Sequence, residues 1–287
     1  MVNERSEKLT NRSAIIKVAE NDVLLRRRWN KEYRYSYALK NIKFIHIGKC
    51  GGTSIIKHFL ESEINVDEYH LRKPEWNRED SYFLWVRNPI KRFVSAFNHS
   101  KSILSHNMEK SDIKNITIEN CQAPQKVIQL IRTGIAFDAE YDGLVSEFNT
   151  ANALAESLTG LNSRLKKRAH NLMSNQQEHI YKGIGWYLDN GQFVDRHVSQ
   201  IGFVGRLEYM RNDFEMLLDH FQLKSLIDGP ITHSRKGRGG FSTELSKLAV
   251  ENIRKYYAKT DYKALDTLKI NGFIGQDTID EYNEYAF

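Results

Sequence analysis

The sequence predicts an α/β fold in which a central parallel sheet is flanked by helices on both faces. Two observations predict it: apolar runs near the start of the chain end in a glycine-rich turn or in Arg-Asn-Pro, and a similar short run begins at residue 201. Helical spacing follows each run, and repeated strand–turn–helix units favour parallel strands. We expect one domain over residues 1–287, with an N-terminal extension at 1–39 and a helical or irregular insertion at 101–200.

The first predicted element is a buried strand at 42–47, because its apolar residues are nearly continuous and β-branched. The strand leads into "FIHIGKCGGTSI" (44–55), and this glycine-rich turn gives the predicted fold a P-loop-like character. The following "GTSIIKHFLES" predicts a helix, since its apolar side chains recur at helical spacing: Ile55, Ile56, Phe59 and Leu60.

The second predicted strand is "SYFLWV" at 81–86, which ends at "RNP". A helix is expected to begin there, because proline is well tolerated in the first turn of a helix and Pro89 comes directly after Asn88. The apolar positions of this helix follow the i, i+3, i+4, i+7 rule: Ile90, Phe93, Val94 and Phe97.

The last predicted strand–helix unit begins with "IGFVGR" at 201–206, which precedes the amphipathic "LEYMRNDFEMLLDHF" at 207–221. A further helix is expected over "STELSKLAVENIRKYYAKT" at 242–260. Ser242 is its candidate N-cap and Glu244 lies in its expected first turn, where a negative charge favours the helix dipole.

The composition describes a globular protein that attracts anions. Hydrophobic residues make up 40% and charged residues 27% of the 287 residues, and no apolar stretch approaches the ~20 residues of a membrane span. The first residues lack a signal peptide's apolar core, which predicts a cytoplasmic chain. Cys50 and Cys121 are too few for a disulfide scaffold or a zinc site. The net charge of +6 suits nucleic acid, an anionic polysaccharide or a phosphorylated cofactor.

The glycine-rich turn is predicted to bind an anion. A strand that enters such a turn and then a helix presents free backbone N–H groups and the positive end of the helix dipole. Gly51 and Gly52 let the backbone approach a phosphate, and Thr53 and Ser54 add hydroxyl donors. Lys49, before the glycines, can reach past the phosphate towards the bond that breaks.

The positions of the cations distinguish this turn from that of a nucleotide triphosphatase. Such an enzyme has its lysine directly before the Ser/Thr that meets magnesium, whereas Gly52 precedes Thr53 here. After the second strand it offers an aspartate for the metal, whereas this chain has Arg87. Two cations at neighbouring strand ends predict a ligand with more than one phosphate group, held by protein charges without a metal.

These two segments resemble those of the sulfotransferases that use 3'-phosphoadenosine-5'-phosphosulfate (PAPS). "GKCGGTS" is similar to that family's loop for the 5'-phosphosulfate, and "VRNPIKRFVSAF" (86–97) to its 3'-phosphate segment. The variant is closest to the membrane-type carbohydrate sulfotransferases, including heparan sulfate 2-O-sulfotransferase and its bacterial relatives. The resemblance implies that the loop from Lys49 binds the phosphosulfate and that Arg87 and Ser95 recognise the 3'-phosphate.

Two later segments support the resemblance. "FVGRLEYMRNDFEMLL" resembles the family's later strand–helix unit, and "SRKGRGGFS" (234–242) resembles the basic loop that closes over the cofactor's phosphates. The resemblance therefore adds Lys236, Gly237 and Arg238 to the expected cofactor site. It implies PAPS as the sulfonate donor and no metal.

Sulfonate transfer needs a base for the acceptor hydroxyl and positive charge near the leaving oxygen. Lys49 is the expected charge stabiliser. A histidine is the expected base, and in carbohydrate-type relatives it lies between the two cofactor segments, which favours His70. Glu61 and Glu63 are the alternatives. His46, on the first strand, is expected to pack within the sheet.

The acceptor is expected to be a glycan or glycoconjugate bound by residues 101–200. A protein or small-molecule acceptor is the alternative, because the cofactor segments carry no signal for the acceptor. The stretch 179–193 places Tyr181, Trp186 and Tyr187 among glycines, and such aromatics either face a sugar or form ordinary core. An acidic glycan could also meet the basic residues of the middle region: Arg164, Lys166, Lys167 and Arg168.

Two rival functions fit part of the sequence. One is a P-loop kinase, which needs magnesium ligands and a lysine directly before Thr53. The other is a non-enzymatic protein that binds a polyanion through its basic charge. A nucleic-acid partner is not expected, because no recognisable nucleic-acid-binding module occurs. Oligomeric state has no signal in the sequence.

Overall fold

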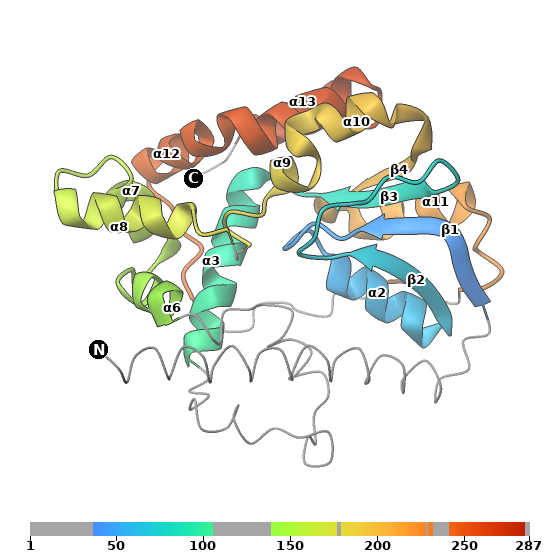
Figure 1. Ribbon diagram of the computed structural model, residues 1–287, viewed down its shortest axis with the longest axis horizontal. Coiled ribbons are helices and arrows are strands. Elements are labelled where there is room, and N and C mark those ends of the chain that lie inside the picture. Colours follow the sequence, from blue (N-terminus) through green and yellow to red (C-terminus); the bar gives the residue numbers. More distant parts are fainter. Residues whose placement is uncertain (1–36, 106–138, 177–178, 228, 232–240, 285–287) are drawn as a thin grey trace, which may run out of the picture.

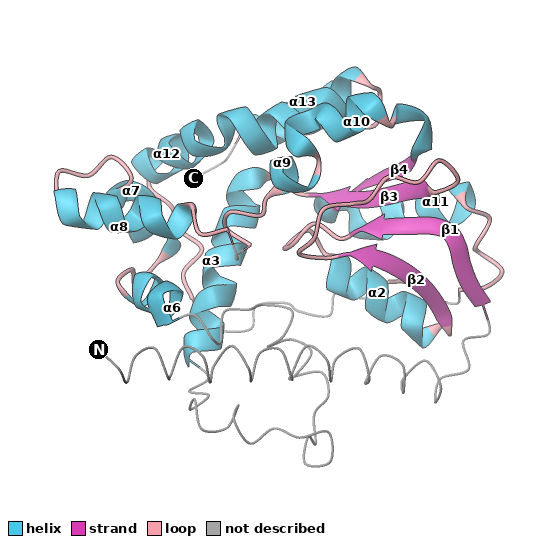
Figure 2. Ribbon diagram, viewed as in Figure 1, coloured by secondary structure: helices cyan, strands magenta, loops and turns pink. Residues whose placement is uncertain are grey.

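The computed structural model describes residues 37–105, 139–176, 179–227, 229–231 and 241–284 (Figure 1). Its core is a four-stranded sheet with the strand order β2-β1-β3-β4, and every neighbouring pair is parallel. Figure 2 shows the strands running side by side with helices around them. The strands are β1 (Tyr37–Ile45), β2 (Ile64–Tyr69), β3 (Ser81–Val86) and β4 (Ile201–Arg206).

Helices cover both faces of the sheet, as the sequence predicts. Further helices form a second layer beside it (Figure 1). In chain order the helices are α2 (Gly52–Glu61), α3 (Pro89–Ser105), α6 (Ala139–Ser146), α7 (Ala151–Ser157), α8 (Ser163–Met173), α9 (Ile184–Tyr187), α10 (Gln192–Arg196), α11 (Met210–His220), α12 (Lys247–Tyr257), α13 (Lys263–Ile270) and α14 (Gln276–Asn283), and a π-helical turn, η5 (Ala258–Tyr262), joins α12 to α13.

Alternate side chains of β3 point to opposite faces of the sheet, as in any strand. Phe83 faces Phe59 of α2, with ring centroids 6.1 Å apart. Tyr82 faces the other side and meets Phe193 of α10 edge-on at 5.6 Å. Because both faces are buried, the strand is apolar throughout, which is why the sequence shows it so clearly.

The strand order places a topological switch point between β1 and β3. The chain passes from β1 to β2 on one side, then returns across β1 to β3 on the other. In open α/β sheets, ligands bind at such a switch point, outside the carboxyl ends of the strands. The turns after β1 and β3, which carry Lys49 and Arg87, meet at this point.

The described part of the 101–200 segment is helical. Its helices α6, α7 and α8 pack with α3 and α12 around a second apolar cluster. Phe93 and Phe97 of α3, Leu154 of α7, Leu172 of α8 and Ile253 of α12 are all fully buried there. The helical character that the sequence predicts is therefore confirmed for these residues, while a role of 101–200 in acceptor binding stays a prediction.

Two predicted element boundaries are wrong. The first strand, predicted at 42–47, is β1 at Tyr37–Ile45, so it begins earlier and ends before His46. Helix α12 begins at Lys247 rather than near Ser242.

The cap of α12 is Ser246. Its Oγ accepts a hydrogen bond from Ala249 N at 3.2 Å and donates one to Glu156 Oε1 at 2.6 Å. Ser242 Oγ instead accepts from Glu244 N at 3.2 Å, in a local turn before the helix. Both serines have the right chemistry for a cap, and the contact with Glu156 of α7 favours the second.

A buried ion pair ties α3 to the rest of the molecule. The Arg92 side chain is fully buried, and its Nε donates to Asp261 Oδ2 of η5 at 3.1 Å. One of its terminal nitrogens donates to the carbonyl of His179 at 2.7 Å. Asp261 Oδ1 in turn accepts from the Gly185 amide at 2.9 Å. Arg92 therefore positions the 179–185 segment as well as its own helix.

Asp261→Ala is expected to cost about 3–5 kcal/mol of unfolding free energy, because it leaves the Arg92 charge buried without its partner. Urea denaturation followed by circular dichroism measures this. The matched control is Lys57→Ala, which removes an exposed ion pair with Glu61 and should cost under about 1 kcal/mol. Similar losses in both variants would contradict a structural role for the buried pair.

Within the described ranges, every helix is too short or too polar to span a lipid bilayer. The cytoplasmic location stays a prediction.

Candidate functional site

The turn between β1 and α2 has a backbone shape that requires glycine at its centre. Gly51 has φ of 91°, and a Cβ there would lie 2.3 Å from Met210 Cε. Lys49 also has a positive φ, 70°. The α2 helix begins at Gly52, and the first N–H groups of a helix have no partner within it. The turn therefore offers backbone donors to an anion at the positive end of α2.

Two other glycines of this turn make room for histidine rings. A Cβ on Gly52 would lie 2.0 Å from His46 Cδ2, and one on Gly48 would lie 2.3 Å from His179 Nδ1. The sequence explained Gly52 by the approach of a phosphate. The structure adds a second reason, which is the ring packed beneath it.

The remaining side chains of the turn differ in exposure. Thr53 is exposed and Ser54 is buried. Cys50 is fully buried, and burial raises the pKa of its thiol to about 12. The thiol therefore stays protonated near neutral pH and is a packing group rather than a nucleophile.

Arg87 connects the two turns directly. It follows the last residue of β3, and its guanidinium donates a hydrogen bond to the carbonyl oxygen of Lys49 at 3.2 Å. Within the described part of the chain this is the hydrogen bond that the guanidinium makes, so further N–H donors remain for a ligand. Burial lowers the pKa of Arg87, but an arginine stays protonated in proteins at neutral pH.

Asn88 fixes the turn that carries Arg87. It is buried, and its side-chain oxygen accepts from Ile90 N at 2.9 Å and from Lys91 N at 3.3 Å, which caps the start of α3. Its own backbone N–H donates to Glu208 Oε1 at 3.2 Å. The backbone next to Arg87 is thus held by the capped start of α3.

Ser95 is half-buried on α3. Two residues on the same face of this helix, Arg92 and His99, both lie beside His179. Arg92, three residues earlier, binds the carbonyl of His179, and the ring of His99, four residues later, lies 5.6 Å from that of His179. Residues three and four apart share one helix face. Ser95 therefore belongs to the stripe of α3 that faces His179.

Four histidines from four segments form a continuous chain of rings. The ring centroids of His46 and His70 are 4.0 Å apart, and those of His70 and His179 are 5.5 Å apart. His99 extends the chain from His179 to α3. His46 follows β1, His70 follows β2, and both lie at the carboxyl edge of the sheet beside Lys49.

His70 has a defined tautomer in its neutral form. Its Nδ1 lies 3.2 Å from the carbonyl oxygen of His46. A carbonyl oxygen only accepts hydrogen bonds, so Nδ1 carries the proton and Nε2 keeps its lone pair. The half-buried ring can thus accept a proton at Nε2.

Glu68 holds His46 in place. Its Oε2 lies 2.6 Å from His46 Nδ1, and the two side chains are 10% and 5% exposed. The pairing follows from the sheet, because Glu68 lies opposite Phe44 in the β1–β2 register. His46 also stacks on Phe44 at 5.2 Å, as expected of a residue packed within the sheet. Through the His46 carbonyl, Glu68 therefore supports His70 indirectly.

His179 is neutral at pH 7. Burial, with smaller contributions from His70, His99 and Lys49, holds the pKa of its ring well below 6.5. Its Nδ1 is buried without a hydrogen-bond partner among the described residues. The ring therefore adds no positive charge beside Lys49.

The site is built from the segments that a known protein family shares. A model described as the sulfotransferase family matches residues 38–269, which include both cationic turns and all four histidines. The chain belongs to the sulfotransferase family. The match shows a transferase of sulfonate groups, while comparisons with curated proteins and with solved structures each returned no match.

The structure of this sulfotransferase places the alternative base Glu61 at the end of α2 away from the loop. Glu61 ends α2, a helix about 15 Å long that begins at the loop, and it pairs with Lys57 at 3.3 Å. Glu63 lies two residues beyond the end of that helix. The choice of His70 as the base stays a prediction.

Motif spacing alone did not single out His99, His179 or Glu68, and it predicted only packing for His46. The number of histidines near the motifs was a signal for the histidines but not for Glu68.

Other expected residues of this sulfotransferase fall outside the site or outside the description. Arg164 and Arg168 of α8 pair with Glu147 at 3.6 and 2.8 Å, so they are partly neutralised. Tyr187 is buried and its hydroxyl accepts from the Leu71 amide at 2.9 Å, which assigns it to the core. The predicted loop residues lie outside the described residues: Lys236, Gly237 and Arg238. Among the described residues no His, Cys, Asp or Glu cluster is arranged to hold a metal ion.

Proposed function

We propose that this sulfotransferase moves a sulfonate group from PAPS to a hydroxyl of a carbohydrate acceptor, with His70 as the base and Lys49 as the charge stabiliser. The observation that carries the proposal is the hydrogen bond from Arg87 to the Lys49 carbonyl. It brings two cationic turns together at the switch point of the sheet, next to a histidine whose Nε2 can accept a proton.

The residues at this switch point suit a nucleotide with two phosphate positions. The loop amides, Lys49 and the start of α2 suit a 5'-phosphosulfate, and Gly51 leaves no Cβ in the way. Arg87 suits a 3'-phosphate, because its planar donors can bind phosphate bidentately. Ser95 adds a hydroxyl from the facing stripe of α3. When bound, PAPS supplies the activated sulfonate.

The protein's own part in the reaction is to move one proton and to neutralise charge. His70 Nε2 takes the proton of the acceptor hydroxyl, while Nδ1–H stays bonded to the His46 carbonyl. The Lys49 ammonium stabilises negative charge on the oxygen that leaves. The neutral His179 ring adds no second positive charge beside it. Alignment of the two partners by the turns supplies the remaining acceleration.

Calorimetry with adenosine 3',5'-bisphosphate and with ATP, each with and without magnesium, tests the cofactor assignment. The bisphosphate is expected to bind without a metal. Arg87→Ala should weaken this binding about 10- to 100-fold, since hydrogen bonds to a charged group contribute roughly 1.5–3 kcal/mol. The control Lys57→Ala removes an exposed lysine of α2 that pairs with Glu61, and it should change nothing.

Two outcomes would reject this assignment. Binding of ATP only with magnesium would favour a kinase. Binding of neither nucleotide would favour a polyanion-binding protein. The carbohydrate acceptor and the cytoplasmic location rest on the sequence, and a screen of acceptors with labelled donor tests the first.

A further inference from the structure

We propose that Glu208 and Tyr282 are positioning residues that hold the Arg87 turn in its anion-binding shape, so that helix α14 completes the site. The identity of the anion rests on the proposed function, whereas the hold on the turn does not. Helix α14 (Gln276–Asn283) lies beyond residues 38–269, the part of the chain that the family model matches, so the match by itself assigns it no role.

Glu208, Tyr282 and Asn88 form a closed network of hydrogen bonds. Glu208 Oε1 accepts from the Asn88 backbone N–H at 3.2 Å, and Glu208 Oε2 accepts from the Tyr282 hydroxyl at 2.9 Å. The side-chain nitrogen of Asn88 donates to the Tyr282 carbonyl oxygen at 3.2 Å. Because Asn88 directly follows Arg87 in the chain, the network fixes the backbone that carries the guanidinium.

The hydrogen bonds of this network are shielded from water. Asn88 and Tyr282 are each only 1% exposed. Burial, with a smaller contribution from Glu208, raises the pKa of the Tyr282 hydroxyl, so the hydroxyl keeps its proton and donates it to the carboxylate. A hydrogen bond to a charged acceptor is stronger in such surroundings, and a buried group left without its partner is costly. The network therefore has one favoured arrangement.

The segment that carries Glu208 also lies against the glycine-rich loop. This segment is the 3₁₀ turn η4 (Leu207–Tyr209), which follows β4. A Cβ on Gly51 would lie 2.8 Å from Leu207 Cδ1 and 2.3 Å from Met210 Cε, so the two side chains pack directly over the loop. One turn after β4 therefore contacts both of the cationic turns.

Helix α14 fixes η4 from the other side. Tyr282 contacts Glu208, and two further residues of the same helix face contact the residues that flank it. Thr278 Oγ1 accepts from a terminal nitrogen of Arg206 at 3.2 Å. Glu281 Oε2 accepts from the Tyr209 hydroxyl at 3.0 Å. The whole face of α14 is therefore matched to the turn that holds Asn88.

The charge of Glu208 gives a separate argument for a positioning role. A carboxylate close to an anion-binding turn repels a phosphate group, so its charge alone would weaken ligand binding. Burial lowers the pKa of Arg87 and the Glu208 charge partly opposes this, which places the carboxylate within electrostatic reach of the guanidinium. The two hydrogen bonds that Glu208 accepts explain why a carboxylate is present there.

Calorimetry of the full chain with adenosine 3',5'-bisphosphate, without magnesium, tests this role. Tyr282→Phe removes one hydroxyl and keeps the ring, and it is expected to weaken binding about three- to tenfold. The matched control is Tyr141→Phe, which removes another fully buried hydroxyl, 2.8 Å from Ser100 Oγ in the second apolar cluster. The control should leave binding unchanged.

Two variants of Glu208 separate its shape from its charge. Glu208→Ala is expected to weaken bisphosphate binding about tenfold, because the Asn88 N–H loses its acceptor. Glu208→Gln should bind at least as tightly as the unaltered protein, since its amide oxygen can still accept that bond and the repulsive charge is gone. Tighter binding by Glu208→Ala would overturn the inference.

A double-mutant cycle shows whether Tyr282 acts through Arg87. In an Arg87→Ala background, Tyr282→Phe should have no further effect on bisphosphate binding. The same loss of affinity in both backgrounds would mean that the hydroxyl acts elsewhere, and it would overturn the positioning role.

Hydrogen exchange of the free protein, followed by mass spectrometry, tests the hold on the turn without any nucleotide. The amides of Asn88, Ile90 and Lys91 should exchange faster in Tyr282→Phe than in Tyr141→Phe. Unchanged exchange there would overturn the inference, whatever the nucleotide does. Faster exchange in a protein that binds no bisphosphate would overturn the proposed cofactor and keep the hold of α14 on the turn.

Discussion

Lys49→Ala is expected to lower kcat for sulfonate transfer about 10²- to 10³-fold, the usual effect of removing one group that stabilises developing charge. The physical reason is the position of Lys49 in the turn after β1, where its backbone has a positive φ and its carbonyl accepts a hydrogen bond from the Arg87 guanidinium. Steady-state kinetics with varied donor concentration measures the effect. We expect KM for the donor to change much less than kcat.

The kinetic pattern separates the two roles open to Lys49. A lysine that only binds phosphate in the ground state would raise KM and leave kcat unchanged. Such a result would contradict the proposed role. Lys57→Ala is again the control, since Lys57 lies on the same helix–loop unit but is exposed and paired with Glu61. Its kinetics should equal those of the unaltered protein.

His70→Ala is expected to lower kcat about 10²- to 10⁴-fold, because the acceptor hydroxyl loses its base. Affinity for adenosine 3',5'-bisphosphate should stay within about twofold, since the cofactor turns are built by other residues. Single-turnover kinetics and calorimetry on the same protein measure both quantities. Added imidazole should restore part of the activity, because the free base can enter the space that the ring leaves.

Variants of one neighbouring histidine and of one carboxylate sharpen this test. His99→Ala changes a ring on α3 that lies beside His179, and it should retain most activity. Glu68→Gln keeps the shape of the His46 contact but removes its charge, so it should lower kcat less than His70→Ala and alter the pH profile. Full activity in His70→Ala would remove this residue from the mechanism.

The sequence was most informative where a short segment carries its own signal. The run 81–86 is apolar on both faces and is bounded by a turn and a proline, so its limits match β3. The strand 201–206 and the helix that begins at Pro89 were equally clear. Ser242 shows the opposite case, because two serines four residues apart could cap the same helix and a contact with Glu156 selects the second.

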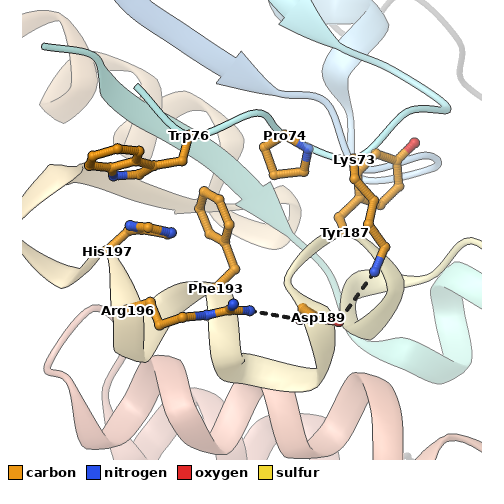
Figure 3. Close-up of a pocket in the computed structure, with 8 residues that line it drawn as sticks. All are labelled: Lys73, Pro74, Trp76, Tyr187, Asp189, Phe193, Arg196 and His197. Carbon is orange, nitrogen blue, oxygen red and sulfur yellow. Dashed lines mark hydrogen bonds and ion pairs between the residues drawn. The ribbon is translucent and has the colours of Figure 1, made fainter. Parts of the chain in front are cut away.

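By itself, the sequence determined the α/β class, the parallel strands, and the two turns that carry Lys49 and Arg87. These properties depend on residues that are close in the chain, so periodicity and motif spacing reveal them. Only the tertiary structure decided that Arg87 binds the Lys49 carbonyl and that Glu68 pairs with His46, whose ring stacks on that of His70. It also decided that the Trp76 ring stacks on His197 (Figure 3). Each of these contacts joins residues from separate elements, and strand register and packing of the whole chain bring them together.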